Sequence, residues 1–142
     1  MRWSAFPGVS AVDDHLIGLL ADDDAYIRER AVQIIGTMDS PAALGALPPM
    51  LDDSDRAVCR AALRALPGHM KSEALCARIV ELMFAFSAEL MADAAAALRR
   101  MDDRGSAARL VAILEDPKQE EFHWICIDAL AEMFARVPGT ER

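Results

Sequence analysis

One stretch of this sequence occurs four times along the chain. The first copy, residues 20–35, returns 31 residues later at 51–66. Weaker copies follow at 90–98, with a one-residue shift, and at 114–130. A fixed period of this length is typical of stacked-repeat folds, in which each unit buries its apolar face only against its neighbours. The repetition therefore predicts a stack of small units, an architecture suited to binding other molecules.

Each repeat contains two runs of apolar residues at helical spacing, separated by turn-forming residues. This pattern predicts a pair of antiparallel helices in each repeat. We expect an all-α fold, an α-solenoid of about four such pairs that forms a single domain over residues 1–142. The expected repeats span about 11–38, 40–67, 72–101 and 106–136.

Polar residues and prolines indicate where these helices begin and end. A side-chain oxygen just before a helix accepts a backbone N–H that has no partner inside it, and we expect such caps at Asp24, Ser40 and Asp116. The helices of the third repeat are expected to begin at Ser72 and after Ser87. Pro48 and Pro49 are expected to end a helix near Leu47, because proline cannot donate the backbone hydrogen bond. In the fourth repeat we expect one helix over 106–114 and a long helix after Asp116-Pro117 that reaches Arg136.

The composition limits the classes of protein to consider. A chain of 142 residues, 54% apolar and 6% aromatic, suffices for one domain with a continuous core but not for two. A net charge of −8 argues against general nucleic-acid binding, which needs a concentrated basic surface. The N-terminus lacks the apolar run of a signal peptide, and no stretch approaches the length of a membrane span. We expect a cytoplasmic protein with no membrane contact.

The residue types that most often carry chemistry are scattered. We expect reduced, buried thiols rather than a metal site, because the cysteines are odd in number and widely spaced: Cys59, Cys76 and Cys126. The histidines have no carboxylate or cysteine at ligand spacing: His15, His69 and His123. We predict no cofactor, no metal and no catalytic residue, and a non-enzymatic role is favoured over an enzymatic one.

The repeated positions resemble those of a known family. A leucine and an aspartate precede the second helix, and an aliphatic residue, an arginine and an alanine begin it. The matching residues are Leu20, Asp22, Ile27, Arg28, Ala31 and Ile35, then Leu51, Asp53, Val58, Ala62 and Leu66. This pattern resembles the HEAT repeat family, most closely the short bacterial repeats of phycobilisome lyase subunits. The resemblance covers residues 11–136 and is strongest in the first two repeats.

The resemblance carries structural and functional expectations. In that family the aspartate and the arginine form a hydrogen-bonded ladder along the stack. Here a continuous ladder is in question, because Cys59, Met91 and His123 stand where Arg28 stands in the first repeat. The family serves as adaptors, transport factors and a few enzymes, so it implies architecture more than activity. The resemblance implies a bacterial protein-binding scaffold, with a bilin lyase-type or other enzyme accessory subunit as the alternative.

A candidate binding surface follows from the helical projection. In each repeat, two positions of the second helix point most directly away from its apolar stripe. In HEAT-like stacks the second helices line the concave side. The outward residues form the expected surface for a protein partner of unknown identity: Glu29, Gln33, Arg60, Arg64, Trp124 and Asp128.

Two interpretations are possible for the tryptophan and for the arginine pair of this surface. Trp124 could anchor a partner beside the small Ala92 and Ala96, or it could fold over those alanines and fill space. Arg60 and Arg64 lie one turn apart and could clamp a carboxylate or phosphate, or they could form a solvated face tied to nearby acids such as Glu29.

Four aromatic residues are candidates for contact with a second copy of the chain in a homo-oligomer. Phe84 and Phe86 occupy a turn that carries aspartates in the other repeats, and Trp3 and Phe6 lie near the N-terminus. An exposed apolar turn indicates a contact surface. The alternative is that the rings pack inside the chain or cap its first repeat.

Overall fold

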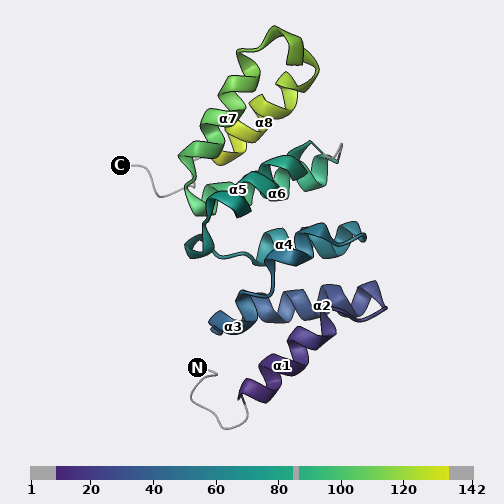
Figure 1. Ribbon diagram of the computed structural model, residues 1–142. Helices are drawn as coiled ribbons and strands as arrows, with labels where there is room; N and C mark the ends of the chain where they lie inside the picture. Colours follow the sequence, from purple (N-terminus) through teal and green to yellow (C-terminus); the bar gives the residue numbers. More distant parts are fainter. Residues whose placement is uncertain (1–8, 85–86, 135–142) are drawn as a thin grey trace, which may run out of the picture. The chain divides into compact units, whose positions relative to one another are not determined.

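The computed structural model describes residues 9–84 and 87–134, with the side chains described from Ala11 onward. The regular structure of these residues is helical throughout (Figure 1). The chain divides into two compact units, Met1–Leu66 and Pro67–Arg142. This boundary coincides with the one expected between the second and third repeats. The expectation of one domain over residues 1–142 remains a prediction.

The first unit contains two repeats. α1 (Val9–Leu19) and α2 (Ala25–Gly36) form the first helix pair. In the second repeat, a short α3 (Pro41–Leu44) and a 3-10 helix η2 (Pro48–Asp52) together replace a first helix, and α4 (Arg56–Ala65) follows. α2 packs along α4, and α1 contacts α2 and α3.

The second unit also contains two repeats. A 3-10 helix η3 (Gly68–Met70) leads into α5 (Glu73–Met83) and α6 (Ala88–Met101). The last repeat comprises α7 (Arg104–Leu114), a 3-10 helix η4 (Pro117–Phe122) and α8 (His123–Met133). α6 packs against both α5 and α8, so second helices lie side by side here as in the first unit.

The expected caps are confirmed. Asp24 accepts from the backbone N–H of Tyr26, Ser40 from that of Ala43, and Asp116 from that of Lys118. The structure adds caps at Ser72 and Ser87, each of which accepts from the N–H three residues later. The break at Pro48 and Pro49 is also confirmed, although the α-helix already ends at Leu44. Both prolines lack the N–H that would continue the helix, so the backbone proceeds as a 3-10 turn.

The fourth repeat departs from the sequence-based expectation. Its first helix begins at Arg104 rather than Ser106, because Asp103 is the cap and accepts from the N–H of Ser106. The expected long helix to Arg136 is wrong within the described residues. Gln119 leaves the helical region at φ −112°, ψ 26°, and its side-chain amide donates to Asp116 at 2.9 Å. The segment after Pro117 is therefore 3-10, and the α-helix begins only at His123.

Each unit has an apolar core between its helix pairs. The largest fully buried side chains of the first unit are Val32, Ile35, Leu47, Leu51, Val58, Leu63 and Leu66. Those of the second are Ile79, Met83, Leu98, Leu110 and Cys126. Small residues let the helices approach closely. A Cβ built on Gly36 would lie 2.7 Å from the Cβ of Ala65, so α2 and α4 meet at a position that requires glycine.

Candidate functional site

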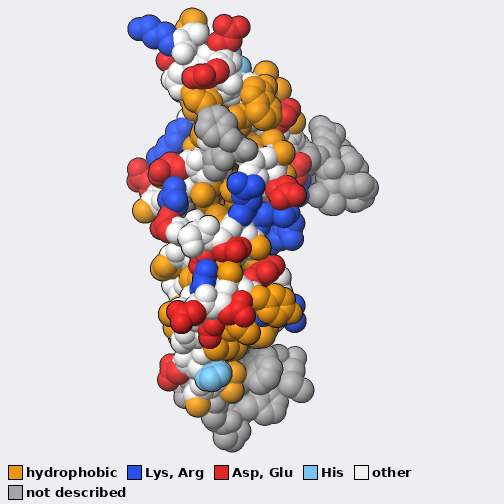
Figure 2. Space-filling model, turned by 90° about the vertical axis from the view of Figure 1, so that its right-hand side faces the viewer, with side chains coloured by type: hydrophobic (Ala, Val, Ile, Leu, Met, Phe, Trp, Pro, Cys, Tyr) orange, Lys and Arg blue, Asp and Glu red, His pale blue; other side chains and the backbone are white. Residues whose placement is uncertain are grey.

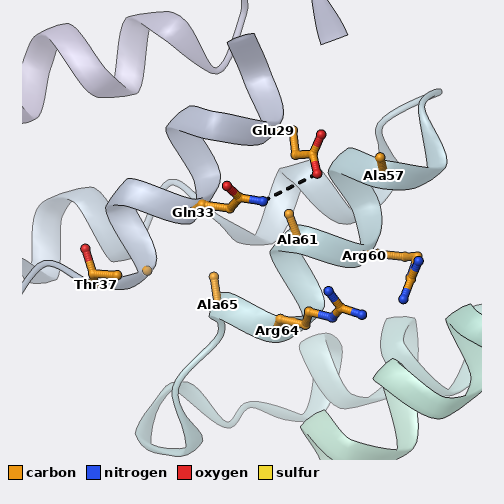
Figure 3. A pocket seen from close by; sticks show the side chains of 9 residues that line it. Glu29, Gln33, Thr37, Ala57, Arg60, Ala61, Arg64 and Ala65 are labelled. Atoms are coloured by element: carbon orange, nitrogen blue, oxygen red, sulfur yellow. Dashed lines mark hydrogen bonds between the residues drawn. The ribbon is translucent and has the colours of Figure 1, made fainter. Parts of the chain in front are cut away.

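A hollow of about 260 Å³ lies between α2 and α4 in the first unit. Small residues leave this space open, because their side chains fill little of the room between the two helices. Figure 3 shows the side chains of the α2 and α4 residues that surround the hollow. The lining residues are Glu29, Gln33, Gly36, Thr37, Ala57, Arg60, Ala61, Arg64 and Ala65.

Four of the six residues predicted as a binding surface line this hollow. Glu29 and Gln33 stand on α2, and Arg60 and Arg64 stand on α4 (Figure 3). The repeat explains why these four residues lie together, because residues 31 positions apart occupy equivalent places on successive second helices. Polar side chains thus surround a small apolar floor.

The α2 side of the hollow is an ordered polar row. The side-chain amide of Gln33 donates to the carboxylate of Glu29 at 3.4 Å. Arg30 in turn donates to the Gln33 side-chain oxygen at 2.7 Å. The row contains an acidic, an amide and a basic side chain. It therefore offers both hydrogen-bond donors and hydrogen-bond acceptors beside the hollow.

The other two predicted surface residues lie on α8 in the second unit. Trp124 is 56% exposed and Asp128 is exposed. The Trp124 ring is therefore not sealed in the core. On α6 of the same unit, Ala92 is exposed and Ala96 is half-buried.

One ion pair joins successive repeats within the first unit. Arg28 on α2 donates from Nε to Asp53 Oδ2 at 2.8 Å and from Nη2 to Asp53 Oδ1 at 3.1 Å. Its Nη1 also donates to the backbone oxygens of Asp22 and Asp23. The hydrogen bond from Arg28 holds the pKa of Asp53 below its ordinary value, against the opposing effect of burial. This is one rung of the ladder that the resemblance implies.

Two of the three residues that replace Arg28, Cys59 and His123, contact the backbone of the segment that precedes their own helix. The Cys59 thiol lies 3.4 Å from the Leu51 backbone oxygen. His123 Nε2 lies 3.0 Å from the Ile113 oxygen and 3.1 Å from the Asp116 oxygen. Cys59 and His123 have shorter side chains than Arg28, but like Arg28 they contact backbone oxygens of the segment before their helix.

The aromatic turn of the third repeat is partly packed. The half-buried Phe84 ring meets Phe122 edge to face, with ring centroids 5.5 Å apart and an interplanar angle of 86°. Phe84 therefore has a partner inside its own unit, as the packing alternative predicts. Phe86, Trp3 and Phe6 lie outside the described residues.

A second hollow of about 230 Å³, in the second unit, was not predicted. It is lined by Lys71, Glu73, Cys76, Asp103, Gly105 and Arg109. The ammonium of Lys71 lies 3.4 Å from Asp103 Oδ1. Burial, and then the nearby Asp103 carboxylate, raise the pKa of the Cys76 thiol. A thiol with a raised pKa is a poor nucleophile, so this arrangement does not indicate catalysis.

The described part of the chain has neither a metal-binding cluster nor a membrane-spanning helix. Residues 9–84 and 87–134 contain no cluster of ligating side chains that could hold a metal ion. No helix among them has both the length and the apolar character to span a bilayer. All three cysteines are free in this structure and buried, so the expected burial of the thiols is confirmed.

A family model for HEAT repeats matches residues 13–84, about half of the chain. A search of curated proteins finds no match. The matched segment covers most of the first two repeats, where the sequence pattern is strongest, and extends over α5. Together with the helical structure, the match confirms the expected fold class, an all-α solenoid of HEAT repeats. The chain belongs to the HEAT repeat family.

Proposed function

We propose that this chain is a protein-interaction module that binds a partner through the surface formed by the second helices of its repeats. The hollow between α2 and α4 carries this proposal. A preformed concave space with a small apolar floor and a polar rim is the usual form of a binding site. HEAT repeats commonly serve as interaction scaffolds, which favours a protein as the partner.

Trp124 and Asp128 form the second part of the proposed surface. A tryptophan that is 56% exposed leaves a large apolar ring in contact with water. Tryptophan is enriched among the interface residues that dominate binding energy, and truncating such an anchor costs about 2 kcal/mol or more. In this proposal Trp124 binds the partner at its own contact point, independently of the hollow.

Affinity purification from the native organism tests this proposal. Wild-type bait is compared with Arg64→Glu, which reverses a charge on the rim of the hollow. The matched control is Lys118→Glu, which reverses an exposed charge on η4. We expect Arg64→Glu to abolish recovery of a specific partner and Lys118→Glu to preserve it. Equal recovery with both variants would contradict a role for the hollow. Melting temperatures of all three proteins separate lost binding from lost folding.

The narrower alternative is a bilin lyase-type accessory subunit or a subunit of another enzyme. Arg60 and Arg64 would then contact the propionates of a linear tetrapyrrole. The hollow supports this role less well, because about 260 Å³ lies below the roughly 300–1,000 Å³ of small-molecule sites. Titrating the protein with a bilin tests it. An absorbance shift that Arg64→Glu removes would favour this role over a protein partner, and an unchanged spectrum would exclude it.

We place this module in the cytoplasm of a bacterium, acting without catalysis of its own. The three free, buried cysteines suit a reducing compartment. The bacterial origin rests on the sequence resemblance alone. Fractionation of native cells, followed by immunodetection, tests the location.

A further inference from the structure

The α2 side of the hollow between α2 and α4 consists of polar side chains that are already hydrogen-bonded along that helix. The side-chain amide of Gln33 donates to Glu29, and its oxygen accepts from Arg30. The hydroxyl of Thr37, which caps the C-terminal end of α2, donates to the backbone oxygen of Ile34 at 2.7 Å. An occupant of the hollow therefore meets an α2 side whose polar groups are bonded to one another.

The α4 side of the hollow carries two positive charges. Arg60 and Arg64 both line it (Figure 3), and Glu29 is the one acid among the described residues of the lining. The lining is thus positive overall, although the whole chain carries a net charge of −8. Arginine has five N–H donors and no acceptor. Each guanidinium can bind a carboxylate with two of these donors while the others keep a partner within the chain.

The residues around the hollow recur once per helical turn. Small side chains recur in this way on α4 at Ala57, Ala61 and Ala65. Four residues of an α-helix rise by about 6 Å, so Arg60 and Arg64 are separated by about that length along the axis of α4. Two carboxylates four residues apart on another helix have the same separation and lie on one face of it. The spacing of the arginines therefore matches a pair of acids on a helix.

We propose, on the basis of the function proposed above, that the hollow binds a helical segment of the partner protein whose acidic side chains, four residues apart, pair with Arg60 and Arg64. A helix forms its own backbone hydrogen bonds, whereas an extended segment needs backbone partners that the bonded α2 side chains do not readily supply. A helix with its side chains is about 10–12 Å across. The hollow of about 260 Å³ therefore admits side chains of the partner helix, while the backbone of that helix lies above the alanines.

Selection from a displayed library of helical peptides tests this proposal. The peptides have an alanine-based helix with random residues on one face, and the full chain is the target. We expect the enriched peptides to carry glutamate or aspartate four residues apart. The double variant Arg60→Glu, Arg64→Glu should instead enrich lysine or arginine at that spacing. The matched control is Arg56→Glu, which reverses an exposed charge on α4 outside the lining and should enrich the same acidic peptides as the wild type.

Fluorescence anisotropy of one enriched acidic peptide, titrated with each protein, gives the change in affinity. Arg64→Glu should raise the Kd at least about tenfold, because it replaces an attraction between opposite charges by a repulsion. Arg56→Glu should leave the Kd nearly unchanged. Circular dichroism checks the folding of each variant, and Arg64→Gln replaces Arg64→Glu if that variant unfolds.

Three results would overturn the proposal: no enriched peptide, enriched peptides without an acidic pair, or an acidic peptide that binds Arg64→Glu as tightly as the wild type. Ala57→Trp, which adds a bulky ring to the lining, separates this failure from failure of the proposed function. Peptides that lack the acidic pair but no longer bind Ala57→Trp would refute the acidic helix and leave the hollow as the binding surface. Peptides that bind Ala57→Trp as tightly as the wild type would count against the hollow itself.

Discussion

Arg28 and Asp53 form a two-pronged ion pair between successive repeats, with nitrogen-to-oxygen distances of 2.8 and 3.1 Å. Their side chains are only 15% and 8% exposed. The pair joins the second helix of the first repeat to the turn of the second repeat. Paired, partly buried charges with two aligned hydrogen bonds contribute more than exposed ion pairs do.

Replacing Asp53 should therefore destabilise the fold. In Asp53→Ala the Arg28 guanidinium loses its carboxylate partner and the Asp55 backbone N–H loses its acceptor, and we expect the free energy of unfolding to fall by about 1–3 kcal/mol. The matched control is Asp23→Ala, which removes an exposed carboxylate from the turn of the first repeat. Denaturant unfolding measures both variants. Equal losses in the two would show that the ion pair contributes nothing specific.

The same pair predicts a pH dependence. Since the pKa of Asp53 is lower in the folded chain than in the unfolded chain, its contribution is fully present above the ordinary aspartate pKa of about 3.9. That contribution is lost as the pH falls below this value through the lowered pKa. Unfolding free energies should drop less steeply in Asp53→Asn than in the wild type over this acidic range. Parallel curves for the two proteins would contradict the assignment.

The close approach of α2 and α4 predicts opposite effects at two glycines. Gly36→Ala should destabilise the chain by about 1–3 kcal/mol, because the new Cβ overlaps Ala65 and forces the helices apart. Gly18→Ala on α1 is the control. Its Cβ would meet no atom within 4 Å, so the higher helix propensity of alanine should stabilise the chain by up to about 1 kcal/mol. Thermal unfolding of both variants checks the contrast.

The Phe84–Phe122 contact predicts a measurable coupling. A double-mutant cycle with Phe84→Leu and Phe122→Leu should give a coupling energy of about 0.5–1.5 kcal/mol, as expected for an edge-to-face aromatic pair. Zero coupling, together with a change in the association state of Phe84→Leu, would instead assign Phe84 to a contact between copies.

Trp124 should affect binding without affecting stability. Because the ring is 56% exposed, Trp124→Ala should leave the melting temperature nearly unchanged. It should raise the Kd for the purified partner at least tenfold, which corresponds to a loss of about 1.4 kcal/mol in binding free energy. The control is Tyr26→Ala, which removes an aromatic ring that is 62% exposed on α2. Isothermal titration calorimetry gives the affinities, and a large loss of stability in Trp124→Ala would assign the ring to packing.

The sequence pattern predicted the helix pairs because caps and apolar spacing are local features. Asp24 and Ser40 act within three residues, so their effect could be predicted without knowledge of tertiary structure. The repeat period likewise predicted that Arg60 and Arg64 would lie beside Glu29 and Gln33, since equivalent positions of stacked helices become neighbours.

Features that depend on contacts between particular side chains could not be predicted in this way. Along the 3-10 path after Pro117, both Lys118 and Gln119 donate hydrogen bonds to Asp116. The packing of Phe84 depends on Phe122, 38 residues away along the chain, and periodicity does not reveal that pair. The need for glycine at position 36 becomes visible only when Ala65 is placed against it.

Chemical-shift mapping tests the proposed binding surface most directly. The isotope-labelled chain is titrated with the partner recovered by affinity purification, and backbone amide shifts are followed. We expect the largest changes around the hollow, at Gln33, Gly36, Ala61 and Arg64, with a second group at Trp124. Changes confined to α1, α5 and α7, with none at these residues, would contradict the proposed surface.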